Sequence, residues 1–461
     1  MRILQILPEL NVGGVETGTV DLAKYLVEHG HDAIVVSNGG PLVKDLESFG
    51  ARHYQLAVHK KSLWTMRCMI KPLREIILKE KVDIVHARSR VPAWIAYFAC
   101  FRTPAQFLTT CHGYYSSSFF SRVMGWGKQV IVPSEAIGRH MIEDFKVPLE
   151  NIRCIPRSVD LTKFQKTRED KPGKSSFTIA IVGRITPLKG HEYFLRAMAK
   201  VVRTMPYVKI WIIGDAPARK EFYRRDLEVL VERLGLKDHV EFLGNRSDIP
   251  DLLTQIDLLV FSSVVPEAFG RVILEAQAAG VPVVATRVGG VVDIIDDEKT
   301  GLLVPPKDPE MMANAIVRVL QDKNLVRQFV QLAREKIEQK FTLEHMAGQT
   351  IKVYEEVLRS PNILVIKMTS LGDVILVTAS LKALRKRYPE AKIYCLVGKE
   401  SRSILQRCPY LDGLIVVDVK GEDRSWWRLW KLSEKLRSYR FDKVIDFQNN
   451  ARSHVLSFLT L

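Results

Sequence analysis

Short apolar runs alternate with helical patterns through the first third of the chain, an arrangement that few folds accommodate. The runs are Arg2–Leu7, Ala33–Ser37, Ile84–His86, Gln106–Thr110 and Gln129–Val132, and the helical patterns are Glu16–His29, Pro41–Phe49, Ser62–Glu80, Pro92–Phe101 and Glu135–Phe145. Buried strands of this kind pair in parallel, and the helices between them cover both faces of the sheet. The sequence therefore predicts an α/β fold whose first domain is a doubly wound parallel sheet.

The same alternation restarts after a charged stretch, Gln165–Ser176, which contains Pro and Gly and is predicted to be a linker. Strands are predicted beyond it at Thr178–Val182, Val208–Ile213, Val240–Leu243, Leu258–Phe261 and Val281–Ala285, and helices at Glu310–Leu320, Leu325–Lys340 and Thr342–Leu358. Pro361 ends the last helix, and a third strand-loop-helix unit begins at Asn362. We predict domains at residues 1–165, 170–341 and 361–461.

Composition limits the class of protein and its partners. The 461 residues fit two to three domains, and six cysteines without a Cys-x-x-Cys pair indicate reduced thiols in a cytoplasmic protein. The longest apolar run, Val91–Phe101, is about half of a membrane span, so any membrane contact is expected to be peripheral. The net charge of +16 favours an anionic partner such as an acidic membrane surface.

The stretch Pro266–Ala276 is the strongest candidate for a ligand site. A glycine-opened helix start leaves backbone N–H groups free for an anion, and diphosphate is the obvious one. Glu275 lies roughly 7 Å further along the helix, within reach of a ribose, and Glu267 precedes the helix, free to meet the group beyond the phosphates. Ordinary surface charge remains the alternative for both glutamates. The predicted donor-binding residues at the helix start are Phe269, Gly270, Arg271 and Val272.

Other candidates lie where predicted strands end, since open parallel sheets bind ligands at the carboxyl ends of their strands. Gly13 and Gly14 lie at the first strand-to-helix turn, where a plain tight turn is the alternative. His86 and His112 end consecutive strands and would face one crevice, although a lone histidine is more often structural.

In the second domain, two cations lie at the carboxyl end of the first predicted strand. Arg184, after Gly183, and Lys189 follow its first predicted strand. There they would neutralise a departing diphosphate, and solvated surface charge is the alternative.

These segments resemble the nucleotide-sugar signature of family-4 glycosyltransferases. The resemblance rests on the Glu267 to Glu275 stretch, the Gly13-Gly14-Val-Glu16 loop and the Gly183-Arg184 strand end, and it covers about Met1 to Arg359. It implies the GT-B architecture, in which two Rossmann-like domains face each other, and transfer of a sugar with retention of anomeric configuration.

The resemblance also implies a role for each candidate. Glu275 would hold the donor ribose, Glu267 would contact the transferred sugar, and His112 would be catalytic beside it. Arg184 and Lys189 would hold the diphosphate. The other implied assignments are Gly13, Gly14, Gly183 and Gly244 on the donor side, Glu16 and His86 on the acceptor side, and residues 342–359 as the helix that crosses back to the first domain.

The segment Asn151–Asp160 departs from the family, in which Asn-Gly-Val-Asp is usual. Arg157 and Ser158 replace Asn-Gly. An added cation at this point would bind a phosphate or an acidic acceptor, so we assign Arg157 to the acceptor side.

The third unit resembles the opening of family-9 glycosyltransferases, the lipopolysaccharide heptosyltransferases. The resemblance rests on Ser370-Leu-Gly-Asp373-Val, on Leu381 to Pro389 and on Phe441 to Asn449. It would make Asp373 the general base on the acceptor hydroxyl, with a helix cap as the alternative. About a hundred residues provide no second Rossmann-like domain, so we expect a partial domain without activity of its own.

The helical pattern Ser62–Glu80 has two interpretations. Its apolar stripe fits a surface helix packed on the sheet, whereas its basic stripe of Arg67, Lys71 and Arg74 fits an amphipathic helix on a membrane surface.

The sequence as a whole predicts a retaining glycosyltransferase of the cytoplasm, peripheral on the inner membrane face, that acts on a cell-envelope glycan or lipid-linked acceptor. A nucleotide-sugar-binding protein without turnover is the alternative. No Asp-x-Asp motif is present, so we expect neither a metal nor another cofactor, with a nucleotide-diphosphate sugar as the donor substrate. No nucleic-acid module is recognisable, so we expect no nucleic-acid partner.

Overall fold

The structure is a computed structural model of the 461-residue chain. It describes every residue except 12, 102, 165–175, 218–220, 360, 419–420, 422, 424, 440 and 461, and it leaves undescribed the side chains of residues 426, 434 and 438. The predicted linker Gln165–Ser176 lies outside the described residues apart from Ser176.

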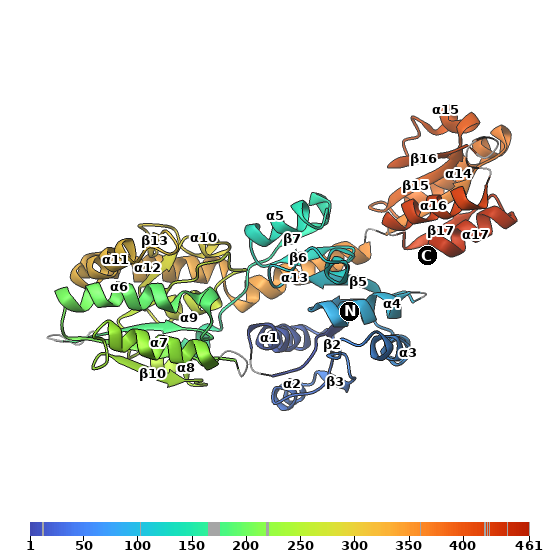
Figure 1. The fold of residues 1–461 in the computed structure, drawn as a ribbon. Coiled ribbons are helices and arrows are strands. Elements are labelled where there is room, and N and C mark those ends of the chain that lie inside the picture. Colours follow the sequence, from blue (N-terminus) through green and yellow to red (C-terminus); the bar gives the residue numbers. More distant parts are fainter. Residues whose placement is uncertain are drawn as a thin grey trace.

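The first domain is a seven-stranded parallel sheet with the strand order β3-β2-β1-β4-β5-β6-β7 (Figure 1). Its strands are β1 (Arg2–Ile6), β2 (Asp32–Ser37), β3 (Arg52–Gln55), β4 (Ile84–Ala87), β5 (Gln106–Thr110), β6 (Val130–Val132) and β7 (Ile152–Cys154). Its helices are α1 (Gly14–Glu28), α2 (Val43–Ser48), α3 (Leu63–Lys79), α4 (Arg90–Cys100), α5 (Glu135–Glu143) and the 3-10 turn η1 (Phe119–Gly125). The order reverses between β1 and β4, so the crevice between their carboxyl ends is the expected ligand position.

The second domain is a six-stranded parallel sheet with the order β10-β9-β8-β11-β12-β13. Its strands are β8 (Phe177–Val182), β9 (Val208–Ile213), β10 (Val240–Gly244), β11 (Leu258–Phe261), β12 (Val283–Thr286) and β13 (Leu302–Val304). Its helices are α6 (His191–Thr204), α7 (Glu221–Arg233), α8 (Ile249–Leu253), α9 (Arg271–Ala278), α10 (Val291–Ile294), α11 (Pro309–Gln321) and α12 (Lys323–Lys340). The two sheets confirm the predicted α/β fold with two doubly wound domains.

A third, four-stranded parallel sheet lies in the C-terminal part of the chain, with the order β16-β15-β14-β17. Its strands are β14 (Asn362–Lys367), β15 (Lys392–Gly398), β16 (Gly413–Val417) and β17 (Lys443–Asp446). Its helices are α14 (Leu371–Arg387), α15 (Arg402–Leu405), α16 (Trp426–Ser438) and α17 (Ala451–Thr460). Separate apolar clusters lie on its two faces, so this module, which we call the third module, has its own core.

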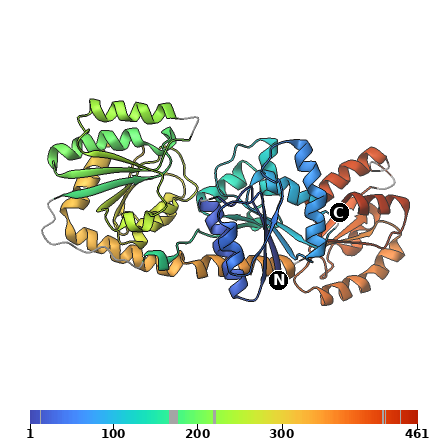
Figure 2. The ribbon, with the colours of Figure 1, turned by 90° about the horizontal axis from the view of Figure 1, so that it is seen from below.

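Two chain segments connect the first two domains at one place. The backbone N–H of Val159 donates to the carbonyl of Phe341 at 2.9 Å, which joins the segment entering the second domain to the one leaving it. Helix α13 (Leu343–Arg359) starts just after this contact and packs along the first domain, where Tyr354 is fully buried with Ile3 and Leu22 (Figure 2). The two connecting segments therefore lie side by side, and the backbone N–H of Glu135 adds a contact between the domains by donating to Asp293 Oδ2 at 2.8 Å.

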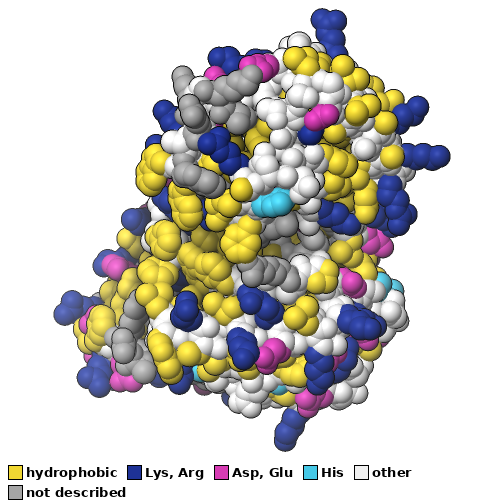
Figure 3. Space-filling view, turned by 90° about the vertical axis from the view of Figure 1, so that its right-hand side faces the viewer, with side chains coloured by type: hydrophobic (Ala, Val, Ile, Leu, Met, Phe, Trp, Pro, Cys, Tyr) yellow, Lys and Arg dark blue, Asp and Glu magenta, His cyan; other side chains and the backbone are white. Residues whose placement is uncertain are grey.

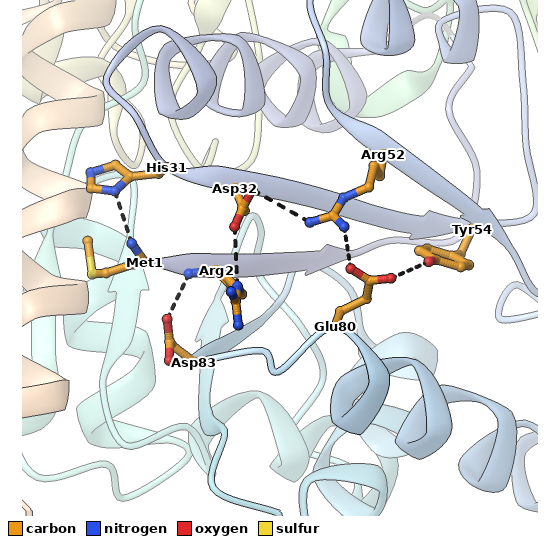
Figure 4. Close-up of polar contacts among 8 residues, drawn as sticks. All are labelled: Met1, Arg2, His31, Asp32, Arg52, Tyr54, Glu80 and Asp83. Atoms are coloured by element: carbon orange, nitrogen blue, oxygen red, sulfur yellow. Dashed lines mark hydrogen bonds and ion pairs between the residues drawn. The ribbon is translucent and has the colours of Figure 1, made fainter.

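A network of charges ties the strands together at the amino-terminal edge of the first sheet, opposite the ligand edge (Figure 4). Asp32 pairs with Arg2 at 3.3 Å and with Arg52 at 3.6 Å, and Arg52 also pairs with Glu80. The Tyr54 hydroxyl donates to Glu80 at 2.6 Å. These contacts link β1, β2 and β3 to the end of α3, which fixes the short edge strand β3 in place.

One ion pair between little-exposed side chains joins the third module to the first domain. Lys128 Nζ lies 2.6 Å from Asp442 Oδ2, and each side chain is only 12% exposed. Lys128 also donates to the carbonyl of Val357 at 3.0 Å, and Asp442 accepts from the backbone N–H of Asn362 at 2.6 Å. The contact therefore fixes the start of β14 to the first domain and to the end of α13.

Replacing Lys128 by methionine is expected to weaken the docking of the third module by about 2 kcal/mol, because Asp442 loses its counter-charge in a nearly buried position. Amide exchange in β14 and β17 should accelerate, while exchange in the second domain should not change. The matched control is Lys382→Met, since Lys382 is exposed on α14 of the same module. Unchanged protection of β14 in Lys128→Met would show that other contacts hold the module.

Candidate active site

The predicted diphosphate position is the start of α9. Gly270 precedes this helix with φ of 97°, a left-handed conformation that favours glycine. Phe269 is buried and packs edge to face on Phe341, with ring centres 6.0 Å apart. The backbone N–H groups at the beginning of a helix lack partners within it, so this rigid turn presents donors to an anion.

The sequence indicated that Glu267 is free to meet a ligand. In the structure, two side chains already contact its carboxylate. Its Oε1 accepts from Lys189 Nζ at 2.6 Å and from Ser263 Oγ at 2.6 Å. Lys189 ends the 3-10 turn η4 (Pro187–Lys189), and its Nζ also lies 5.2 Å from the centre of the Phe261 ring. The cation predicted for the diphosphate and the carboxylate predicted for the sugar therefore form one unit.

The backbone of Glu267 is held by the Gly289-Gly290 turn. Gly290 N–H donates to the Glu267 carbonyl at 2.8 Å. Gly289 has φ of 52°, and a Cβ placed on it would lie 2.2 Å from the same carbonyl oxygen. Only glycine allows the two loops to approach this closely.

Glu275 also has a partner. Its Oε1 lies 3.0 Å from Arg271 Nε, one turn earlier on α9. Burial raises the pKa of the Glu275 carboxyl, and the Arg271 guanidinium opposes that shift. A ribose at this point would therefore meet a carboxylate whose charge is partly compensated.

The remaining donor-side candidates lie along the same edge of the second sheet. Arg184 is exposed just beyond β8, after Gly183, so its guanidinium is accessible to a ligand. Gly244 ends β10, and its carbonyl accepts from Gly214 N–H at 2.8 Å. Val272 is partly buried against the core of this domain, so it supports the helix start.

In the first domain, His112 and Arg157 contact each other. An Nη2–H of Arg157 donates to His112 Nδ1 at 3.1 Å, so the ring proton belongs on Nε2. Burial and then the Arg157 charge lower the pKa of His112 well below its ordinary value, which keeps the imidazole neutral. Nε2 is buried and has no hydrogen-bond partner among the described residues, so it is available as a neutral donor.

His86, which the sequence places on the acceptor side, lines one pocket together with His112 and Arg157, but its ring nitrogens already have partners. Its Nδ1 lies 2.7 Å from the Tyr354 hydroxyl, its Nε2 lies 2.6 Å from Thr110 Oγ1, and the residue is 1% exposed. Both ring nitrogens are thus occupied by the protein, and His86 fixes α13 to the first sheet rather than presenting a free nitrogen.

The Gly13-Gly14 loop lies against the same cluster. A Cβ placed on Gly14 would lie 2.9 Å from Arg157 Nη1 and 4.0 Å from Arg271 Cδ, and a Cβ on Gly13 would lie 2.4 Å from the Glu16 carboxylate. Arg271, from the second domain, therefore reaches the loop of the first. The two halves of the site meet at Gly14.

Asp373, a predicted catalytic residue, does not join this cluster. It lies on α14 in the third module, away from the cleft (Figures 1 and 2). Its Oδ2 lies 2.9 Å from Lys367 Nζ, and that cation holds the pKa of the carboxyl below its ordinary value. A carboxylate paired in this way is a poor general base.

Sequence reasoning overlooked Arg88. It directly follows β4, is 7% exposed, and donates from Nη1 to Gln5 Oε1 at 2.8 Å. Its position one residue beyond a strand at the crevice was visible in the sequence, but its burial was not.

His191, at the start of α6 beside Lys189, makes the second domain sensitive to acid. Burial lowers the pKa of this fully buried histidine to about 4, while its backbone contact with Thr186 opposes the shift. The unfolded chain binds the proton first, so stability is fully present above pH 6.5 and is lost as the pH falls.

We expect this histidine alone to remove about 2 kcal/mol of stability between pH 7 and pH 5. Denaturant unfolding at both pH values would measure the loss. The His191→Gln variant should have a smaller pH dependence, and an equal dependence in both proteins would contradict the prediction.

Two open parallel sheets that face each other across such a cleft are the arrangement of the GT-B glycosyltransferases. Comparison with known proteins agrees. Residues 163–336 match the family model described as "Glycosyl transferases group 1", and residues 12–163 match that described as "Glycosyltransferase Family 4". The chain belongs to the GT-B glycosyltransferases that contain both of these domains, and it is therefore a transferase enzyme.

Solved and curated relatives extend over the first two domains. A glycosyltransferase from Rickettsia africae is 32% identical with a TM-score of 0.70, and the match covers 77% of this chain and 98% of that one. The N-acetyl-alpha-D-glucosaminyl L-malate synthase of Bacillus anthracis is 26% identical over 76% of this chain and 95% of its own length. Anabaena HepE, solved with UDP and glucose, has the same fold with a TM-score of 0.66 at 24% identity, covering 77% of this chain and 99% of that one.

Proposed function

We propose that this glycosyltransferase moves a sugar from a nucleoside-diphosphate donor, with retention, to a cell-envelope glycan or lipid-linked acceptor. The observation that supports this best is the Lys189–Glu267 pair just before the start of α9, the helix whose Arg271 reaches the Gly14 loop of the first domain. A diphosphate at the helix start would have Lys189 and Arg184 as cations, and the attached sugar would lie between Glu267 and His112. HepE, of the same fold, was solved with UDP and glucose.

The chemistry follows from where charge develops. As the sugar–phosphate bond breaks, negative charge grows on the leaving diphosphate, and fixed cations and helix N–H groups stabilise it. The neutral His112 Nε2–H would donate to the sugar, and Glu267 would lie on its other side. We assign no metal and no further cofactor to this reaction.

The test is turnover of donors. The purified chain and Glu267→Ala would be incubated with a panel of nucleotide-sugars and a lipid-linked or lipopolysaccharide-core acceptor extract, and nucleoside diphosphate release would be followed. Release by the wild type and not by the variant supports the proposal and identifies the donor. Binding of donors without any turnover would favour the alternative, a nucleotide-sugar-binding protein.

For the third module we propose a heptosyltransferase-like domain without activity of its own. The four-stranded parallel sheet and the α14 start after β14 support the resemblance of fold. Asp373→Asn is therefore expected to leave sugar transfer by the first two domains unchanged, because Asp373 lies outside their cleft.

We also propose that the enzyme works at an anionic membrane surface, to which α3 and its neighbours bind. None of the described helices combines the length and apolar character needed to cross a bilayer. Met66, Leu73 and Ile77 pack α3 on the sheet, and Arg74 donates to the carbonyl of Phe98, so most of this helix is structural.

The first turn of α3 exposes large apolar side chains to solvent, and this supports membrane contact. Leu63 is 66% and Trp64 75% exposed, with Lys60, Lys61 and Arg67 exposed nearby. Phe98, Phe119 and Phe120 are further exposed aromatic side chains on α4 and η1, and hydrophobic side chains gather on this face with Lys and Arg around them (Figure 3). Apolar and basic side chains together bind anionic bilayers.

Vesicle flotation tests this surface. The wild type should float with vesicles containing phosphatidylglycerol and not with phosphatidylcholine alone. Trp64→Ser combined with Leu63→Ser should reduce the bound fraction several-fold, while Tyr207→Ser, an exposed aromatic residue of the second domain, should not. Equal flotation of both variants would exclude α3 as the membrane contact.

A further inference from the structure

A pocket opens at the carboxyl ends of the first sheet, beside the cleft. Arg88 enters it from the end of β4, His112 from the end of β5 and Arg157 from beyond β7, while Gly14 forms one wall and Arg271 reaches in from the second domain. Most of the lining therefore belongs to the first domain, whereas the Lys189–Glu267 pair belongs to the second.

Two guanidinium groups in this pocket have only neutral partners. Arg157 donates to His112 Nδ1 at 3.1 Å, and Arg88 donates to the side-chain amide of Gln5 at 2.8 Å. Over the described part of the chain, neither arginine has a carboxylate oxygen within 4.0 Å. The Nε atoms of both are buried without a hydrogen-bond partner.

Carboxylates lie nearby, since Glu16 acts on both arginines and Asp21 on Arg88, but neither forms an ion pair with them. Arg271 is paired with Glu275 at 3.0 Å. Asp21, on α1, also lines the pocket, but the cation acting most strongly on it is Arg271. Burial and then the Arg88 and Arg271 charges lower the pKa of Arg157 to about 10, while Tyr115 and Glu16 oppose the shift.

Buried cations without counter-ions are costly, and proteins ordinarily pair them. Retaining two of them around an open pocket is understandable if a ligand supplies the negative charge. His112 also lines the pocket, and its Nε2–H, which has no partner among the described residues, adds a neutral donor.

We propose that this pocket binds an oxyanion of the acceptor, a phosphate or a carboxylate, through Arg88 and Arg157. This inference rests on the proposed function and names the substrate class of its acceptor side. The donor diphosphate has its own cations, Arg184 and Lys189, so the two anions occupy different subsites. An acceptor held by its anionic group would present its hydroxyl to the sugar beside His112.

The test uses the full-length chain with its donor site filled by UDP. Binding of glycerol 3-phosphate, of succinate and of uncharged glycerol would be measured by isothermal titration calorimetry. The two anions represent the phosphate and carboxylate sources, and glycerol is the neutral reference. The wild type is expected to bind at least one anion about tenfold or more tightly than glycerol, as charge-assisted hydrogen bonds imply.

The variants decide whether the pocket is responsible. Arg157→Gln is expected to lower the affinity for the anion about tenfold, and Arg157→Lys is expected to recover most of the loss. Arg139→Gln, which removes an exposed arginine from α5 of the same domain, should bind as the wild type does. Equal anion affinity in Arg157→Gln and wild type, or an equal loss in Arg139→Gln, would overturn the proposal.

The binding experiment distinguishes a failure of this inference from a failure of the proposed function. If UDP binds and neither anion does, the acceptor inference alone is wrong. If no nucleoside diphosphate binds the wild type, the proposed function is wrong, and the inference with it.

Discussion

Replacing Lys189 by alanine is expected to lower kcat/KM for sugar transfer about 10³-fold. The substitution removes a cation from the developing diphosphate charge and, at the same time, the 2.6 Å contact that positions Glu267. Both losses affect the transition state more than the bound donor, so kcat should fall further than KM rises. Steady-state release of nucleoside diphosphate would measure the effect.

Two further variants separate these causes. Lys189→Arg keeps the charge but not the compact geometry, so it should recover only part of the rate. Lys209→Ala removes an exposed lysine from β9 of the same domain and should leave the rate unchanged. A Lys189→Ala rate within tenfold of the wild type would show that neither the cation nor its pairing with Glu267 matters for transfer.

Replacing Gly289 by alanine is expected to reduce turnover about 10²-fold and to destabilise the second domain by about 3 kcal/mol. The new Cβ would meet the backbone of Glu267 at 2.2 Å, and φ of 52° is unfavourable for alanine. Relief of this contact requires movement of the loop that holds the Glu267 carboxylate. Turnover and denaturant unfolding of the same preparation would measure both effects.

Gly348→Ala is the matched control for this substitution. Gly348 lies within α13, and a Cβ placed there has open space. Alanine should therefore keep or slightly raise stability, because glycine is unfavourable inside a helix. If Gly289→Ala behaved like this control, the close approach of the two loops would not be needed.

The regular parts of the fold could be predicted from the sequence because buried parallel strands are continuous apolar runs. The predicted ranges Gln106–Thr110, Val208–Ile213 and Leu258–Phe261 coincide with β5, β9 and β11. In the first two domains, the strands that were overlooked are short and lie at sheet edges. β3 is Arg-His-Tyr-Gln, without an apolar run, and β7 and β13 have three residues each. Such strands form because neighbouring strands supply hydrogen bonds, which a local pattern does not contain.

For the site, the sequence predicted where the functional residues lie but not which of their side chains contact each other. Strand ends and glycines indicated where Glu267, Lys189 and Arg157 lie. The contact of Lys189 with Glu267 joins residues 78 apart in the chain, and side-chain orientation over that separation depends on packing. For the same reason, no pattern distinguished the buried Arg88 from the many arginines on the surface.

The hydrogen bond between Val159 and Phe341 places both inter-domain segments at one point, and α13 runs from there along the first domain to Lys128 and the third module. Any hinge motion between the two domains would therefore bend the chain at these two segments. The third module, the exposed first turn of α3 and the pocket of Arg88 and Arg157 all belong to the first-domain side of these segments, so they would move together relative to the donor-side domain. With the proposed membrane and acceptor contacts on one side and the donor site on the other, the enzyme would exchange its donor while its acceptor stays bound.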